Sequence, residues 1–420
     1  MLISFDVKNY QSIRESQGIS FVASRLKDNP DGLLRHEAIR DTELLPAILV
    51  YGPNAAGKSN LLKSIKSMIN TVLNSHTRGG PGSEIPTWHP FKLRRDTENQ
   101  PTSYNMNFIV EDVHYRYGFS VSRNFIEEEW LFSFPYGTPR RLFERNKENF
   151  IFGRHLKGRN TAISEFTRNN SLFLSAAAQN DHDQLTSIYN FFSSIQIETS
   201  LSISAPNIVQ KFKDEHNWNI DEDVIDFLKK INTGIVGFQV KKRQIPQEAL
   251  DISKKLDVAV RSIFGDKESD FRITSSMDID KIIELQHEGG RGKRAYLPIE
   301  MESSGTLRLM SALPKIFGAL INGGIVAIDE LDLSLHTQAA EALLELFCSS
   351  ETNVKGAQLI ASTHDTNLLQ ASFLRRDQVW FVEKNQSGET ELYPLTDIKT
   401  RTTDNIERGY LQGRFGAVPR

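Results

Sequence analysis

The chain has 420 residues, of which 39% are hydrophobic and 25% are charged, with a formal net charge of −3 and a pI of about 6.4. These values are typical of a large soluble globular protein, and they exclude a general electrostatic attraction to nucleic acid or to anionic membranes. The single cysteine, Cys348, excludes a disulfide framework within the chain and a zinc site built on several thiolates.

The first residues alternate between apolar and polar side chains from Leu2 to Val7, which indicates a strand and not a signal peptide. A second strand is predicted over 19–23, and a polar, loop-like segment over 24–43. No run of about 18 apolar residues occurs, so the sequence predicts no membrane segment. We therefore expect a cytoplasmic protein without membrane contact.

The strongest motif follows a predicted buried strand over 47–51. The eight residues after it fit the P-loop pattern G-x-x-x-x-G-K-[ST] at every fixed position. They are Gly52, Pro53, Asn54, Ala55, Ala56, Gly57, Lys58 and Ser59. Apolar residues then recur at helical spacing over 61–69, so strand, loop and helix follow in the order that this motif needs.

The motif predicts an ATP site in which backbone N–H groups of the loop surround the phosphates. Lys58 would reach the β- and γ-phosphates, and the Ser59 hydroxyl would bind Mg²⁺. Asn60, at the start of the helix, is included in the predicted nucleotide-binding segment. The alternative is an ordinary glycine turn before a helix, which the complete pattern makes less favourable.

The segment 103–152 alternates with a period of two, which predicts an antiparallel meander with one solvated face. Its aromatic residues could stack nucleic-acid bases, but packing in a core is the better interpretation. After a loop over 77–90 and this meander, a short strand is predicted over 172–175, followed by Gln179. From Asp183 to about residue 264 the pattern is mainly helical, without heptads long enough for a coiled coil.

The last third alternates strand and helix again, which implies a mostly parallel, covered sheet. Strands are predicted over 325–328, 358–362 and 379–382, and a helix over 339–347. The predicted class is therefore α/β, with a mixed sheet, an antiparallel β meander and an inserted helical lobe. The predicted division is an ATPase lobe over 1–180, a helical lobe over 181–300 and a second ATPase lobe over 301–420.

The strand over 325–328 ends in Asp329-Glu330, and ligand sites of α/β sheets lie beyond the carboxyl ends of strands. We expect Asp329 to hold Mg²⁺ and Glu330 to act as the general base that polarises the attacking water. The alternative is that Asp329 and Asp332 only cap the next helix.

His364 follows the strand over 358–362, at the same predicted edge of the sheet. We expect it to hydrogen-bond the γ-phosphate, although a lone histidine is often structural and Asp365 could simply cap a helix. The serines and glycine Ser303, Ser304 and Gly305 precede an apolar helical run and form a candidate anion cradle. An ordinary helix cap remains open for them.

The order of P-loop, helical insertion, Ser-Ser-Gly, Asp-Glu and His resembles the ABC-type ATPase heads of the SMC/Rad50 class. The resemblance implies a nucleotide sandwiched between two subunits, with Ser303, Ser304 and Gly305 acting across the interface. It also makes Gln179 the candidate glutamine that contacts the metal. Two departures are Gly305-Thr306, where the signature usually ends in Gly-Gln or Gly-Glu, and His336, where an aspartate is expected.

Further stretches resemble the RloA/AbiL-like ATPases of abortive-infection and restriction-linked loci, with the overcoming-lysogenization-defect nucleases and the PARIS ATPase as cousins. These stretches are Val7–Ile13, Tyr115–Phe119, Asn170–Gln179, Glu330–His336 and Gly413–Pro419. The resemblance implies a homo-oligomeric, Mg²⁺-dependent ATPase of anti-phage defence that controls a separately encoded effector, such as a nuclease or toxin. 

Two other functions stay open at this point. A DNA-repair or chromosome-maintenance ATPase would use basic clusters at 241–243 and at 291–294, although solvated charge is the better interpretation of each. A self-contained nuclease would need a further domain, and about 55 residues after His364 are fewer than a domain usually has.

Overall fold

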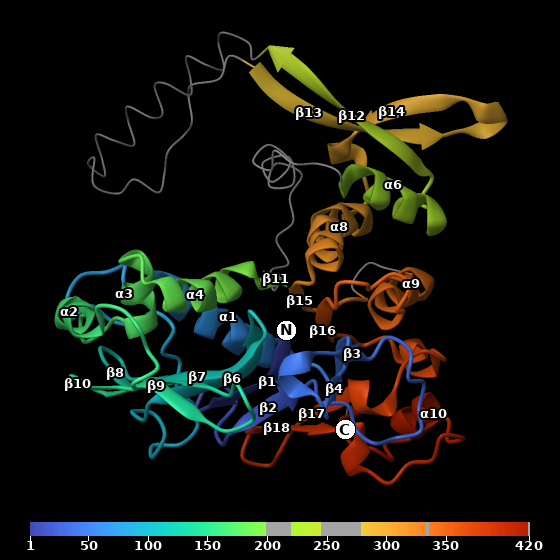
Figure 1. The fold of residues 1–420 in the computed structure, drawn as a ribbon. Coiled ribbons are helices and arrows are strands. Elements are labelled where there is room, and N and C mark those ends of the chain that lie inside the picture. Colours follow the sequence, from blue (N-terminus) through green and yellow to red (C-terminus); the bar gives the residue numbers. More distant parts are fainter. Residues whose placement is uncertain (199–219, 245–278, 333–335, 419–420) are drawn as a thin grey trace. The chain divides into compact units, whose positions relative to one another are not determined.

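The computed structural model describes residues 1–198, 220–244, 279–332 and 336–418 (Figure 1). The chain divides into two units, one formed by Met1–Ser200 with Lys315–Arg420 and the other by Leu201–Pro314. The three segments predicted from the sequence remain a prediction. The mixed α/β class is confirmed, because the chain contains an antiparallel sheet, a mostly parallel sheet and helices.

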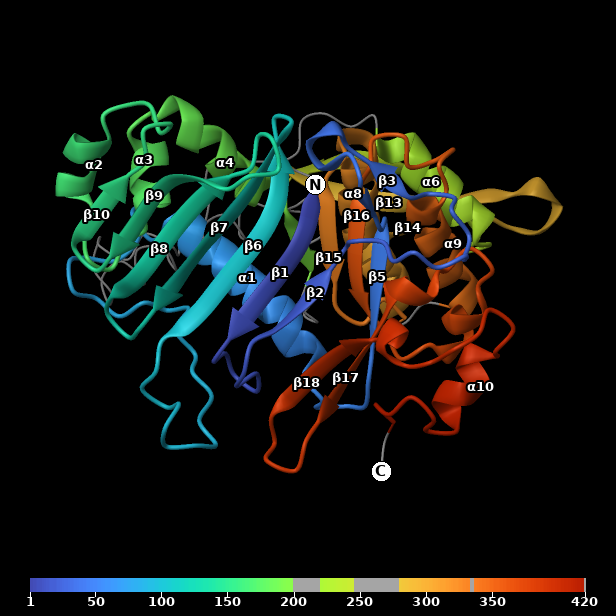
Figure 2. The same ribbon diagram turned by 60° about the horizontal axis from the view of Figure 1, so that its bottom comes forward.

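The larger unit contains a seven-stranded antiparallel sheet, seen face-on in Figure 2. Its strands in spatial order are β10 (Asn149–Phe152), β9 (Arg140–Asn146), β8 (Ile126–Ser133), β7 (Val113–Val121), β6 (Thr102–Val110), β1 (Leu2–Lys8) and β2 (Gln17–Ser20). The predicted meander is therefore confirmed over 102–152.

The buried face of this sheet carries the aromatic residues that alternate in the sequence. Tyr104, Phe108, Tyr117 and Phe119 are fully buried. The rings of Phe108 and Tyr117 contact Phe192 of α4 (Asp183–Ser194) edge-on, with centroids 5.5 and 5.6 Å apart. The aromatic side chains thus build the core, as predicted, because a period of two places them all on one face.

The second sheet of this unit holds the P-loop strand. Its strands in spatial order are β11 (Gln196–Glu198), β15 (Ile325–Ile328), β16 (Gln358–Ser362), β5 (Ala47–Tyr51), β17 (Val379–Lys384) and β18 (Thr390–Pro394). All neighbouring pairs are parallel except β17 and β18. Strands β5, β15 and β16 are buried along their whole length, which explains why β5 and β15 are apolar throughout and why the centre of β16 is apolar.

The remaining helices of the larger unit cover these sheets or join their strands. They are α1 (Lys58–Asn74), α2 (Asn160–Phe166), α3 (Phe173–Gln179), α9 (Thr337–Cys348) and α10 (Ile406–Leu411). Two short strands, β3 (Leu34–Arg35) and β4 (Glu43–Leu44), form a separate ladder. The tail of the chain is held by backbone contacts, since Tyr393 and Tyr410 donate their hydroxyls to the carbonyls of Phe415 and Ala417.

The smaller unit, as far as it is described, combines helix and antiparallel sheet. It contains α6 (Ile220–Lys230), β12 (Ile235–Gln244), β13 (Ile279–Glu288), β14 (Arg294–Pro298) and the first part of α8 (Ser304–Asn322). Strand β12 pairs with β13, and β13 pairs with β14.

Two secondary-structure predictions are wrong. The mainly helical pattern predicted from Asp183 onward fails at β12, where Ile235, Phe238 and Val240 pair with β13. The strand predicted over 172–175 belongs to helix α3. The four apolar or small residues over 172–175 are compatible with a strand or a helix. The helix is favoured here because the buried carboxylate of Glu129 on β8 accepts hydrogen bonds from the backbone N–H groups of Phe173 and Leu174.

Candidate nucleotide-binding and catalytic site

The P-loop joins β5 to α1, as the motif predicts. Its two glycines lie where other chain segments come very close. A Cβ atom at Gly52 would lie 2.2 Å from the carbonyl oxygen of Val382, and one at Gly57 would lie 2.3 Å from Thr390 Oγ1. Gly57 also has a φ of +123°, a conformation that side-chain-bearing residues rarely adopt. Glycine is therefore required at both positions to shape the loop.

Helix α1 begins at Lys58 with Gly57 as its N-cap, and no side chain caps this end. The first-turn backbone of a helix directs N–H groups and the positive end of the dipole toward the preceding loop. The first turn contains no acidic residue that would offset this charge. The start of α1 is thus suited to bind an anion such as a phosphate group.

The Lys58 side chain is 6% exposed and lies against its own loop. Its ammonium group donates to the carbonyl oxygens of Gly52 at 2.7 Å and Pro53 at 3.2 Å. Burial lowers the pKa of Lys58 from its ordinary value, while the carboxylates of Asp329, Glu330 and Asp332 act in the opposite direction. The lysine and these three carboxylates therefore lie within electrostatic reach of each other.

Neighbouring parallel strands bring these groups together. Strands β15, β16 and β5 are adjacent in the sheet, so their carboxyl ends, followed by Asp329, Thr363 and Gly52, share one edge. This is the edge at which the sequence placed the phosphate site.

Ser362, the last residue of β16, joins the two acidic residues. Its hydroxyl donates to Asp329 Oδ1 at 2.6 Å and accepts the backbone N–H of Glu330 at 2.8 Å. Glu330 has a φ of +57°, in the left-handed region that is uncommon for residues with a side chain. The aspartate is thus held in a fixed orientation, and the chain turns sharply at the glutamate.

Asp329 and Asp332 do not cap the next helix, which was the alternative interpretation. The N-cap of α9 is His336, whose Nδ1 accepts the N–H of Gln338 at 3.3 Å. Asp332 Oδ1 instead accepts the backbone N–H of His364 at 3.0 Å. Residues 333–335 of the stretch that carries the family resemblance lie outside the described residues, as does Pro419 of the C-terminal stretch.

His364 lies at the carboxyl end of β16 with an exposed ring. Partial burial lowers its pKa below the ordinary value, the positive charge of Lys58 lowers it further, and Asp332, Glu330 and Asp329 oppose this shift. The imidazole is therefore neutral at pH 7. The cap interpretation of Asp365 is correct, because its carboxylate accepts the N–H of Asn367 at the start of the 3₁₀ helix Thr366–Gln370.

Gln179 is not brought to this site. Its side-chain amide donates to the hydroxyl of Tyr189, which itself donates to the carbonyl oxygen of Leu73 near the end of α1. Leu73 lies 15 residues along the helix from Lys58, and at 1.5 Å per residue this is about 22 Å. The predicted metal contact of Gln179 is thus contradicted by its position, because the segment over 172–175 folds as helix α3.

Ser303, Ser304 and Gly305 lie at the start of α8, within the smaller unit. The Ser303 hydroxyl accepts the backbone N–H of Thr306 at 3.1 Å, which is the ordinary cap that the sequence left open. Ser303 and Ser304 are exposed. Their predicted action on the nucleotide of another subunit remains a prediction.

Sequence reasoning missed a hydroxyl network that supports the P-loop. Thr390 Oγ1 donates to the carbonyl oxygen of Ala56 at 2.8 Å and lies 2.7 Å from Ser12 Oγ. Asn60 Nδ2 donates to the same Ser12 Oγ at 2.6 Å. No motif marks Thr390, which is more than 300 positions from the loop, and only the folded sheet brings it to Ala56 and Ser12.

The site offers the ligand types that a nucleoside triphosphate with Mg²⁺ requires. The Ser59 hydroxyl and the Asp329 carboxylate are hard oxygen ligands, which Mg²⁺ prefers. Among the described residues no cluster of three or more His, Cys, Asp or Glu forms a metal site. Mg²⁺ does not need such a cluster, because in phosphate-transferring enzymes it typically binds one or two carboxylates together with the phosphates. The residues present therefore fit this ion. No helix in the described part of the chain has the length and apolar character needed to cross a membrane.

Comparison with solved structures finds many matches, and two of them are ABC proteins of low sequence identity and low TM-score. The first is cbiO1 from Clostridium perfringens, part of the ABC transporter complex cbiONQ, with 12% identity, coverage of 95% of this chain and 91% of that chain, and a TM-score of 0.30. The second is the ATP-binding cassette MJ0796 in a dimeric post-hydrolysis state bound to ADP and Pi, with 13% identity, coverage of 93% and 98%, and a TM-score of 0.26. Similarity at this level does not define the fold of this chain.

Comparison with curated proteins finds no match. A protein-family model matches residues 48–370, which is more than half of the chain, and its description is "AAA domain, putative AbiEii toxin, Type IV TA system". The matched range includes the P-loop, the Asp329-Glu330 pair and His364. The chain is thus a P-loop nucleoside triphosphatase that belongs to this AbiEii-type AAA family.

Proposed function

We propose that this chain is a Mg²⁺-dependent ATP hydrolase of the ABC/SMC-like type that works as an ATP-sandwiched dimer or larger homo-oligomer. In this proposal it acts as the sensor and regulator of a bacterial anti-phage system and controls a separate effector protein. The observation that supports the hydrolase is the convergence of the P-loop lysine with Asp329 and Glu330 at one edge of the parallel sheet.

Each residue of the proposed site has a separate task. The loop amides and Lys58 bind the phosphates, and Ser59 with Asp329 would hold Mg²⁺, which supplies positive charge to the phosphate oxygens when bound. Glu330 accepts a proton from the attacking water, and the neutral His364 donates a hydrogen bond to the γ-phosphate. Ser362 keeps the Asp329 carboxylate aimed by donating to one of its oxygens.

The proposed defence role rests on two kinds of similarity. The family description names a toxin of a type IV toxin–antitoxin system. The sequence also resembles the RloA/AbiL-like ATPases, and more distantly the PARIS ATPase and the overcoming-lysogenization-defect family. The family description supports a system of two proteins, and the resemblance supports a role in anti-phage defence.

The hydrolase is tested by Lys58→Ala. Removing one charged group that stabilises the transferred phosphate typically lowers the rate by about 10²–10³-fold. We expect phosphate release from ATP to fall at least that much. Lys63→Ala, which changes an exposed lysine on the same helix, is the matched control and should keep wild-type turnover. Wild-type turnover by a folded Lys58→Ala protein would contradict the proposal.

A DNA-repair or chromosome-maintenance ATPase is the second candidate. Lys241, from one of the two basic clusters, forms an ion pair with Glu284 at 2.7 Å, so this charge has a partner within the chain. The side chains of Lys242, Arg243 and Arg291 lie outside the described part. Strong stimulation of ATP hydrolysis by added DNA would favour this candidate, and we expect no such stimulation.

A further inference from the structure

A groove of about 860 Å³ opens beside the start of α1. One wall is the turn between β1 and β2, with Gln11 and Ser12, and another is the segment 84–99 that leads from α1 toward β6. The two walls are joined, because the backbone N–H of Gln11 donates to the carbonyl oxygen of His89 at 2.7 Å. Figure 2 shows the β1–β2 turn beside the loop that enters β6. The volume lies within the range of small-molecule sites.

The groove is connected to the P-loop through Asn60. This residue lines the groove and lies two positions after Lys58 on α1. Its amide donates to Ser12 Oγ, and Ser12 in turn bonds to Thr390, which holds the P-loop carbonyl of Ala56. A ligand in the groove would therefore touch the same network that fixes the phosphate loop.

The position of the groove relative to the P-loop determines which part of a bound nucleotide would reach it. In a P-loop the lysine reaches the β- and γ-phosphates, so the γ-phosphate end faces the catalytic carboxylates. Neither Asp329, Glu330 nor His364 lines the groove. The groove is thus separate from the residues proposed for hydrolysis, and it can accept the part of the nucleotide opposite the γ-phosphate.

The lining of the groove is suited to a flat aromatic group with polar edges. The indole of Trp88 is fixed by a hydrogen bond from Nε1 to the carbonyl oxygen of Gln100 at 3.3 Å. The ring of His89 packs edge-on against Tyr10, with centroids 6.0 Å apart. Partial burial lowers the pKa of His89, and the nearby Lys92 lowers it further, so this ring is uncharged at pH 7.

Apolar side chains complete the walls. Ile85 and Phe91 are buried, while Leu93 is 68% exposed although it is a large hydrophobic residue on a loop. Bases stack on aromatic side chains in nucleic-acid-binding proteins, and the aromatic and apolar surface here has the same character. Asn60 and Asn99 add amide groups that can hydrogen-bond to the ribose or to base edges.

We propose that this groove binds the ribose and base of the nucleotide whose phosphates lie in the P-loop, with the base against the indole of Trp88. The inference rests on the proposed ATPase function and extends it to the part of the substrate that the P-loop does not contact.

The test compares ATP with inorganic tripolyphosphate, which has the phosphates but no nucleoside. Binding to the full chain is measured by isothermal titration calorimetry with Mg²⁺. Stacking on one aromatic residue contributes about 5- to 150-fold in affinity by alanine substitution. We expect Trp88→Ala to weaken ATP binding by that factor and to leave tripolyphosphate binding unchanged. Trp88→Phe should keep most of the ATP affinity.

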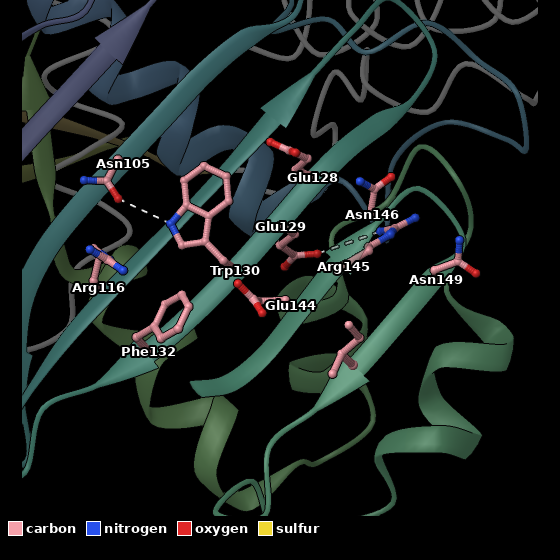
Figure 3. Close-up of a pocket in the computed structure, with 11 residues that line it drawn as sticks. Asn105, Arg116, Glu128, Glu129, Trp130, Phe132, Glu144, Arg145, Asn146 and Asn149 are labelled. Atoms are coloured by element: carbon pink, nitrogen blue, oxygen red, sulfur yellow. Dashed lines mark hydrogen bonds and ion pairs between the residues drawn. The ribbon is translucent and has the colours of Figure 1, made fainter. Parts of the chain in front are cut away.

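Trp130→Ala is the matched control. Trp130 is a partly buried tryptophan on β8, and its indole lines a different pocket together with Arg116 and Phe132 (Figure 3). This variant should bind both ligands like the wild type. His89→Ala provides a second, exposed groove substitution that does not depend on the stability of the Trp88 variant, and it should also weaken ATP selectively.

The outcomes separate the two claims. If folded Trp88→Ala and His89→Ala both keep the wild-type ratio of ATP to tripolyphosphate affinity, the groove is not the nucleoside site, while the ATPase function stands. An equal loss for both ligands would also overturn the groove proposal, because it would indicate damage to the phosphate loop. If the wild type binds neither ligand, the proposed function itself fails.

Discussion

The Ser362 hydroxyl links the two acidic residues of the candidate site, donating to Asp329 and accepting from the backbone of Glu330. The Asp329 carboxylate, which we propose as the metal ligand, is held by this hydrogen bond, whereas the Glu330 side chain is placed by a left-handed backbone turn. A residue in that conformation costs about 1 kcal/mol or more, which the surrounding structure must offset. Such strain at Glu330 is consistent with a positioned catalytic group.

At this scale we predict the effect of Glu330→Gln. The amide keeps the size of the side chain but removes the basic charge, and loss of a positioned general base lowers the rate by about 10²–10⁴-fold. ATP binding should persist, since the phosphates and metal are held by other residues. Phosphate release and calorimetric ATP binding, measured on the same preparation, check both parts.

Near-normal hydrolysis by Glu330→Gln would end the assignment of Glu330 as the base. Asp365→Asn is a suitable control, because Asp365 lies near the same edge and acts as a cap of a 3₁₀ helix. Its amide can still accept the N–H of Asn367, so turnover should stay near that of the wild type.

At the scale of an element, helix α3 depends on a carboxylate from strand β8. Glu129 is fully buried and accepts hydrogen bonds from the N–H groups of Phe173 and Leu174 and from the hydroxyl of Tyr117. The Arg145 guanidinium on β9 lies 3.8 Å from the Glu129 carboxylate (Figure 3). The same guanidinium donates to the carbonyl oxygen of Ser171, just before the helix. Burial raises the pKa of Glu129, while Arg145 and the two N–H groups oppose this shift.

We therefore predict that Glu129→Ala strongly destabilises the protein. The substitution leaves a buried guanidinium without its carboxylate and two backbone donors at the start of α3 without an acceptor. Breaking a buried pair in this way costs about 3–5 kcal/mol of unfolding free energy. Urea denaturation followed by circular dichroism measures the change.

The adjacent residue supplies the control. Glu128 lies on the same strand but is exposed, so Glu128→Ala should change the unfolding free energy by less than about 0.5 kcal/mol. Equal stability of the Glu128 and Glu129 variants would show that the buried carboxylate does not hold α3 in place.

At the scale of the whole molecule, the proposed sandwich predicts complementation between two inactive chains. Lys58→Ala lacks the P-loop lysine, and Gly305→Asp places a charged side chain in the signature. In a mixed dimer, one site takes its P-loop from the Gly305→Asp subunit and its signature from the Lys58→Ala subunit. We expect partial recovery of phosphate release after mixing.

The control mixture combines Lys58→Ala with Glu330→Gln. Both residues belong to the same half of the proposed site, so no intact composite site forms and no recovery is expected. Subunit exchange is followed separately with fluorescent labels. Complete exchange without recovery in the first mixture would mean that each active site is built from one chain.

The local parts of the candidate site could be predicted from short stretches of sequence. A phosphate loop could be predicted because its fixed residues, Gly52, Gly57, Lys58 and Ser59, lie within one short segment. A meander could be predicted over 103–152 because one face of the sheet must be apolar, which requires alternating residues. The sequence also placed Asp329, Glu330 and His364 at strand ends, because each follows an apolar run typical of a buried strand. These strand ends were expected to lie together because the carboxyl ends of parallel strands share one edge of the sheet.

Features that depend on residues far apart in the chain could be seen only in the folded structure. Glu129 selected a helix where the apolar run over 172–175 is equally compatible with a strand, and this moved Gln179 to the end of α1 opposite the P-loop. Thr390 and Ser12 reach the loop only because β18 and the β1–β2 turn are folded beside it. Such contacts arise from sheet order and packing, which leave no periodic or spaced pattern in the sequence.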